Sequence, residues 1–191
     1  MWALVTDNTI TKIINNPKGL VIGDTQYSRN IFSFRWSNEE REAIGIYEVG
    51  FDNTNKKDEA YYSNTNQTFA FADGAVTASF GSATAKSLTD TTNEDDSISL
   101  GLKSQRKETV KQQSSSLLTT YDWYVIRKAD AGTAVPSAIT TYRAAVRTKS
   151  GEMETLIDAC STVDELAALY EYTEQEDGSF TRPLGEFPEA V

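Results

Sequence analysis

The sequence contains no histidine and only one cysteine, Cys160, among its 191 residues. Without histidine the chain cannot build a Ser-His-Asp or Cys-His nucleophile, a histidine metal site or a histidine pH switch. A lone cysteine cannot close an intrachain disulfide, and no set of thiols and imidazoles is available to hold zinc. We therefore expect neither a metal nor a cofactor, and a role in binding rather than catalysis.

Positive charge is also scarce, since 18 Lys and Arg stand against 28 Asp and Glu and leave a formal net charge of −10. Such a chain repels the phosphates of nucleic acids and the head groups of anionic lipids. No apolar run approaches the roughly 20 residues that span a bilayer, and the first ten residues do not resemble a secretion signal. We expect no nucleic-acid or membrane partner, and a protein made and kept in a cytoplasm.

Proline and glycine are few, at 4 and 11 residues, while 39% of the chain is hydrophobic. This composition is typical of a globular protein. The first half favours strands. One hairpin is predicted over residues 2–14 around the Asp7-Asn8 turn, and another over 67–80 around Asp73-Gly74. Ser37, followed three residues later by Glu40, predicts a short helix over 38–44 that opens with a capping box.

The second half favours helices. A polar stretch covers residues 82–97, and we place the domain boundary within it, near residue 93. From about residue 95, apolar residues recur at intervals of three and four. Poor helix formers at 112–116 predict a break. Two antiparallel helices are expected next, 121–128 against 137–148, and a capping box at Thr162 opens a further short helix.

The fold class predicted from these patterns is α+β. It has an N-terminal β-rich domain with hairpins and one short helix over residues 1–93. A helical domain with a helical hairpin follows over 94–170. Residues 171–191 are acidic and rich in turn formers, and are expected to form a short hairpin or an ordered tail.

Three features could carry chemistry. The acidic run at 93–96 is interpreted as charge at the start of a helix, with catalysis or calcium binding as the lesser alternative. The basic residues at 103–111 are interpreted as a solvated helix face, with a docking face for an acidic partner as the alternative. Cys160 lies among apolar residues at helical spacing, which favours a buried, inert thiol.

Aromatic and arginine side chains gather between residues 121 and 147, and these residue types are enriched at the centres of protein interfaces. Packing within the helical hairpin is the competing interpretation. Both can hold, because a small helical pair lacks the volume to bury every aromatic ring. The candidate partner-binding residues are Tyr121, Trp123, Tyr124, Arg127, Tyr142, Arg143 and Arg147.

The segment 117–149 carries a Leu-rich lead, T-x-D-W-x-x-x-R, a loop ending in Val-Pro, and Y-R-x-x-V-R. It resembles a segment near the C-terminus of tail-fibre assembly and tail-associated proteins of tailed phages. The matching residues are Leu117, Leu118, Asp122, Trp123, Arg127, Val135, Pro136, Tyr142, Arg143, Val146 and Arg147. Residues 14–33 and 36–49, with the following Asp-Asn-Thr-Asn, resemble the start of tail proteins of marine tailed phages.

The resemblance implies a structural or adaptor protein of a phage tail or baseplate that joins or supports the tail fibre through protein–protein contacts. Its location would then be the virion, after synthesis in the host cytoplasm. Its partners would be tail-fibre or baseplate proteins, and self-association into a homo-oligomer is kept open beside them. The alternative is a tail-fibre assembly chaperone that is absent from the mature virion. The family's chaperones end in an apolar or proline-rich segment, whereas this chain ends in an acidic one.

Overall fold

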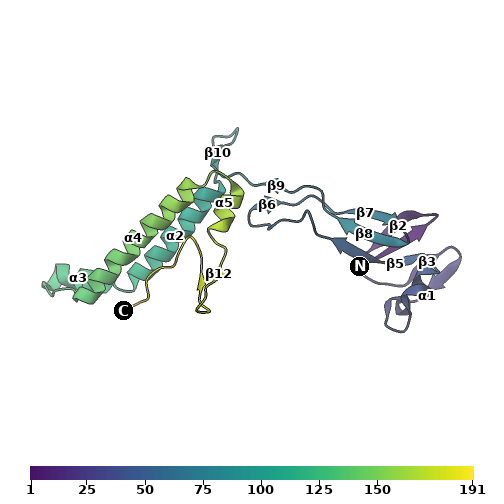
Figure 1. Ribbon diagram of the computed structural model, residues 1–191, viewed down its shortest axis with the longest axis horizontal. Helices are drawn as coiled ribbons and strands as arrows, with labels where there is room; N and C mark the ends of the chain where they lie inside the picture. Colours follow the sequence, from purple (N-terminus) through teal and green to yellow (C-terminus); the bar gives the residue numbers. More distant parts are fainter. The chain divides into compact units, whose positions relative to one another are not determined.

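The computed structural model describes residues 1–191 and divides them into two compact units, Met1–Thr84 and Ala85–Val191 (Figure 1). The fold is α+β, as predicted, with the sheet in the first unit and the long helices in the second. The division falls at Thr84, near the start of the polar stretch, rather than near residue 93. The C-terminal residues 171–191 belong to the second unit.

The first unit is built on a five-stranded sheet in the order β2-β1-β5-β8-β7. Its strands are β1 (Trp2–Thr6), β2 (Thr9–Ile14), β5 (Ile46–Asp52), β7 (Thr68–Ala72) and β8 (Ala75–Ser79). Only β5 and β8 pair in parallel. Side chains alternate across a strand, so one face gathers the buried cluster Ala3, Val5, Val49, Val76 and Ala78.

Both predicted hairpins are confirmed. The turn residues Asp7 and Asn8 have φ of 49° and 58°, and Asp73 and Gly74 have φ of 51° and 75°. Two consecutive left-handed residues give the turn whose twist matches that of paired strands. The turn residues thus fix the pairing of β1 with β2 and of β7 with β8.

The predicted short helix, α1 (Asn38–Glu42), opens with the Ser37–Glu40 capping box. It carries Arg41, which is 6% exposed and donates hydrogen bonds to the main-chain carbonyls of Ile31, Ser33 and Trp36. This one side chain therefore orders the loop before α1. The remaining elements of the unit are η1 (Arg29–Phe32), β3 (Leu20–Ile22), β4 (Thr25–Tyr27) and β6 (Tyr62–Ser63), with β9 (Thr84–Ala85) at the boundary.

The second unit is built on two long helices, α2 (Leu102–Thr119) and α4 (Ser137–Ala159), which lie side by side in Figure 1. They are antiparallel, because Lys103 near the start of α2 bonds to Asp158 near the end of α4, and Arg143 in α4 bonds to Leu118. The unit also contains α3 (Asp122–Ala131), α5 (Val163–Ala168), β10 (Thr91–Thr92), β11 (Ile98–Ser99), β12 (Thr173–Glu174) and β13 (Phe180–Thr181). The capping box predicted at Thr162 opens α5.

The core of this unit follows one stripe of α4 and the facing residues of α2, α5 and the C-terminal segment. Its fully or almost fully buried residues are Leu102, Val110, Ile139, Tyr142, Val146, Met153, Ile157, Cys160, Val163, Leu166 and Leu184. Leu184 is held by a hydrogen bond from its N–H to the carbonyl of Leu169. The C-terminal segment is thus part of the core rather than an appendage.

Three predictions for this unit were wrong. The helical hairpin exists, but its arms are α2 and α4, and α3 buries no residue. The break expected at 112–116 is absent, because the small side chain of Ser114 is buried within α2 and tertiary packing outweighs weak helix propensity. The acidic run at 93–96 forms the turn between β10 and β11, where Asp96 has φ of 61° and Asp95 accepts a hydrogen bond from the N–H of Ser97.

Replacing Leu166 tests this core. Leu166 is 0% exposed, so Leu166→Ala removes buried methyl groups and leaves a cavity, which should lower the free energy of unfolding by about 2–5 kcal/mol. The same change at Leu156, which is 38% exposed, should cost less than about 1 kcal/mol. Urea unfolding followed by circular dichroism at the helical wavelength measures both. Equal losses would show that Leu166 is not in the core.

Candidate protein-binding surface

Helix α3 differs from the other helices because none of its side chains is buried. It follows α2 after a break at Thr120 and Tyr121, where the N–H of Tyr121 bonds to the carbonyl of Leu118. Gly132 ends it in the left-handed conformation, with φ of 69°, and its N–H bonds to the carbonyl of Lys128. Both ends of this short helix are therefore fixed.

Arg143 attaches α3 to the helical pair. Its guanidinium is 2.7 Å from the carbonyl oxygen of Leu118 in the last turn of α2, and 2.8 Å from the carboxylate of Asp122 in the first turn of α3. Arg143 is 8% exposed, so these bonds lie in a partly desolvated place, where they are stronger than at the surface. One α4 side chain thus sets the angle at which α3 leaves α2.

Aromatic contacts support the same joint. The rings of Tyr121 and Tyr142 meet edge to face, with centroids 5.2 Å apart. Tyr142 is 4% exposed, and burial raises the pKa of its phenol above the usual range. Tyr121 is also 6.5 Å from Tyr124, which brings α3 into the same aromatic cluster.

On α3 itself, the guanidinium of Arg127 lies over two rings, 4.7 Å from the centroid of Trp123 and 5.3 Å from that of Tyr124. Cation–π attraction of this kind contributes about 0.5–1 kcal/mol at exposed sites. The Nε atom of Arg127 is covered and has no hydrogen-bond acceptor. The arginine is therefore held in place by rings and not by an acid.

Beside Arg127, α3 presents apolar side chains to solvent: Trp123 is 49% exposed, Val125 44% and Ile126 66%. We call Trp123, Val125, Ile126 and Arg127 the α3 surface. Trp123, Ile126 and Arg127 follow helical spacing and share a side of α3, whereas Val125 lies on the other side. Exposed tryptophan and arginine are among the residue types enriched at interface centres.

The structure places the seven candidate residues in two groups and one separate position. Trp123 and Arg127 are on the α3 surface, with Tyr121 and Tyr124 half-buried behind them. Tyr142 and Arg143 are buried and hold α3 from within, so they do not face a partner. Arg147 is exposed on α4, where it donates to the carbonyl of Arg143.

Sequence reasoning missed Val125 and Ile126. Both fall in a segment for which packing within a helical hairpin competed with partner binding, and periodicity does not say which side of a short helix is covered. Their signal was indirect. Residues 121–131 carry more apolar positions than one buried stripe of a ten-residue helix can use.

The basic residues of α2 act within the unit. Lys107 forms an ion pair of 2.7 Å with Asp158, and this hydrogen bond raises the pKa of the lysine. Lys111 lies 3.6 Å from Glu154, and the Arg106 guanidinium lies over the ring of Tyr170. These side chains tie α2 to α4 and to Tyr170, just after α5, which supports neither a freely solvated face nor a docking face.

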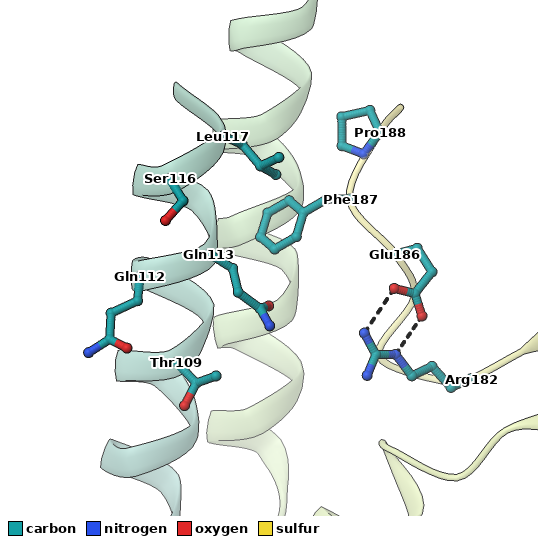
Figure 2. Close-up of a pocket in the computed structure, with 9 residues that line it drawn as sticks. All are labelled: Thr109, Gln112, Gln113, Ser116, Leu117, Arg182, Glu186, Phe187 and Pro188. Atoms are coloured by element: carbon teal, nitrogen blue, oxygen red, sulfur yellow. Dashed lines mark hydrogen bonds and ion pairs between the residues drawn. The ribbon is translucent and has the colours of Figure 1, made fainter. Parts of the chain in front are cut away.

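A groove of about 590 Å³ runs between α2 and the C-terminal segment (Figure 2). In that view the Phe187 ring points toward Leu117 and Gln113, and Arg182 and Glu186 form a two-bond ion pair at one end, with N–O distances of 2.7 and 2.9 Å. The groove is lined by Thr109, Gln112, Gln113, Ser116, Leu117, Arg182, Glu186, Phe187 and Pro188. The chain's own C-terminal segment forms one wall and places its aromatic ring against α2.

The remaining features offer no second centre of chemistry. Cys160 is buried, as expected, and burial followed by the nearby Glu165 charge raises the pKa of its thiol. No group of three or more Asp, Glu or Cys side chains is arranged to hold a metal ion. No helix is both long and apolar enough to cross a membrane.

Comparison of the chain with protein-family models, with curated proteins and with solved structures gave no match.

Removing the Arg143 guanidinium should loosen α3. Arg143→Gln loses the Asp122 ion pair and leaves the Leu118 carbonyl without its donor, so we expect a loss of about 1–3 kcal/mol in unfolding free energy. Amide hydrogen exchange in residues 122–131 should rise at least about tenfold, because that helix buries little else.

The matched control is Arg147→Gln. Arg147 is exposed and four residues along the same helix, so its replacement should change stability by no more than about 0.5 kcal/mol. Unchanged exchange in α3 after Arg143→Gln would contradict the anchoring role of Arg143.

Proposed function

We propose that this chain is a structural or adaptor protein of a bacteriophage tail or baseplate, which connects or supports the tail fibre by protein–protein contacts. The observation that carries the proposal is the α3 surface, a solvent-facing helix with an exposed Trp123 and an arginine fixed over aromatic rings. Trp, Tyr and Arg dominate the binding energy of measured interfaces.

The α3 surface is suited to binding because it is rigid before a partner arrives. Arg143 and Asp122 fix the helix, and the Trp123 and Tyr124 rings hold the Arg127 side chain. A surface that is already ordered loses less conformational entropy on association. More of the free energy gained by burying its apolar area on binding then contributes to affinity.

The segment that resembles tail proteins contains both the residues that fix α3 and the residues that α3 exposes. Asp122, Tyr142 and Arg143 of that pattern are the residues that fix α3, whereas Trp123 and Arg127 are those that α3 presents. The resemblance and the surface are separate observations on the same residues. Together they favour a tail protein that uses this helix to bind.

Two compact units, each with its own core, also suit an adaptor, because each can contact a different neighbour. The alternative, a tail-fibre assembly chaperone, would use the same α3 surface transiently and leave before the virion is complete. The two roles differ in whether the protein remains in the mature virion.

Peptide mass spectrometry of purified, salt-washed virions of the encoding phage tests the proposal. An adaptor should be present at a fixed ratio to the major tail protein. Recovery only from infected-cell lysate, bound to fibre protein, would indicate the chaperone. Absence from both fractions would refute a tail role.

The surface itself is tested by Ile126→Asp. Ile126 is 66% exposed, so the change should alter stability little but place a charge in the apolar contact, lowering incorporation into virions at least about tenfold. Val21→Asp, at a 62% exposed residue of the first unit, is the matched control and should be incorporated normally. Normal incorporation of Ile126→Asp would exclude α3 as the binding surface.

A further inference from the structure

Arg127 is the cation of the α3 surface, and no carboxylate of the chain forms an ion pair with it. Asp130, one turn later on the same helix, does not pair with it either. The exposed Trp123 and Ile126 lie on the same face as Arg127, at three- and four-residue spacing. The surface is therefore complementary to a carboxylate that stands beside an apolar side chain.

The β12–β13 hairpin offers that combination. Its turn is closed by the N–H of Gln175 bonding to the carbonyl of Ser179. Glu174 and Glu176 are exposed and form no ion pair, and Phe180 is 61% exposed. Carboxylates and an aromatic ring thus project together from one short hairpin.

The two features do not meet within one copy of the chain. Figure 1 draws α3 at one end of the α2–α4 pair and the hairpin apart from it. The hairpin has strands of only two residues, and every residue from 171 to 181 is exposed. A hairpin of this size has little stability of its own, so docking on another surface would stabilise it.

We infer that the α3 surface binds the acidic β12–β13 hairpin of a second copy of this chain. Glu174 and Glu176 of one copy approach Arg127 of the other, and Phe180 packs against Trp123 and Ile126. The contact is heterologous, because each copy contributes a hairpin to one neighbour and an α3 surface to another, so it produces closed rings or open chains.

This inference goes beyond the proposed function, and either can fail alone. Self-association covers the apolar part of the α3 surface in the free protein. A tail partner that uses the same surface competes with the hairpin, so binding of the two is mutually exclusive.

Sedimentation velocity of the full chain over a range of concentrations tests the contact. We expect concentration-dependent association that weakens as salt is raised, because ion pairs contribute to it. Arg127→Glu should raise the dissociation constant at least about tenfold, and so should Glu174→Lys together with Glu176→Lys. Glu189→Lys, an exposed acid outside the hairpin, is the control and should associate normally.

Mixing the variants gives the sharper test. Arg127→Glu retains an intact hairpin, and the Glu174→Lys/Glu176→Lys variant retains an intact α3 surface. The mixture should therefore associate into a heterodimer, although each variant by itself associates weakly. A wild-type chain that stays monomeric at every concentration would overturn the inference, as would association indifferent to the hairpin variant, or no heterodimer on mixing.

Failure here is distinguishable from failure of the tail role. The hairpin variant leaves α3 unchanged, so under the proposed function it should still enter virions. A wild-type protein that enters virions but stays monomeric at every concentration would overturn this inference alone. The hairpin variant's self-association defect together with absence of the wild-type protein from virions and lysate complexes would overturn the tail role alone.

Discussion

The geometry of the helical unit depends on one buried arginine. Arg143 joins three helices, because it belongs to α4, bonds to the last turn of α2 through Leu118 and to the first turn of α3 through Asp122. A buried cation without partners would be strongly unfavourable, so this side chain holds its neighbours in the one arrangement that satisfies it. The direction of α3, and with it the position of Trp123 and Arg127, follows from that requirement.

The same principle operates in both units with different partners. Arg41 in the first unit is buried against three main-chain carbonyls and the side-chain oxygen of Asn38 and orders a loop, whereas Arg143 uses a carbonyl and a carboxylate and orders a helix. A planar guanidinium can donate in several directions at once, which a lysine at either position could not reproduce. In each unit, therefore, one arginine converts an irregular connection into a defined one.

Local patterns predicted those parts of the fold that local interactions determine. The Asp7-Asn8 and Asp73-Gly74 turns and the two capping boxes were predictable because turn and cap geometry depends on a few adjacent residues. Long-range packing was not predictable in this way. Ser114 faces the helical contact and α2 continues through it, although its neighbours are poor helix formers.

For the candidate site, sequence reasoning found the residue types but assigned some of them to the wrong side. Tyr142 and Arg143 were candidates for a partner surface, yet they are buried, while Val125 and Ile126 were not among the candidates and are exposed. An apolar stripe on a helix predicts that it packs against something, not what it packs against. Because α4 packs against α2 rather than against α3, no other helix buries the side chains of α3.

The small size of the α3 surface limits what it can do alone. A stable protein interface buries about 800 Å² on each partner, and three exposed apolar side chains with one arginine supply only its centre. A single contact of this kind is weak. Copies held next to one another by contacts elsewhere would present several free α3 surfaces to the same assembly, and the second and later contacts would then form at a high effective concentration. The proposed self-association and the proposed attachment to a tail compete for one surface, and a weak contact is one that can change partners.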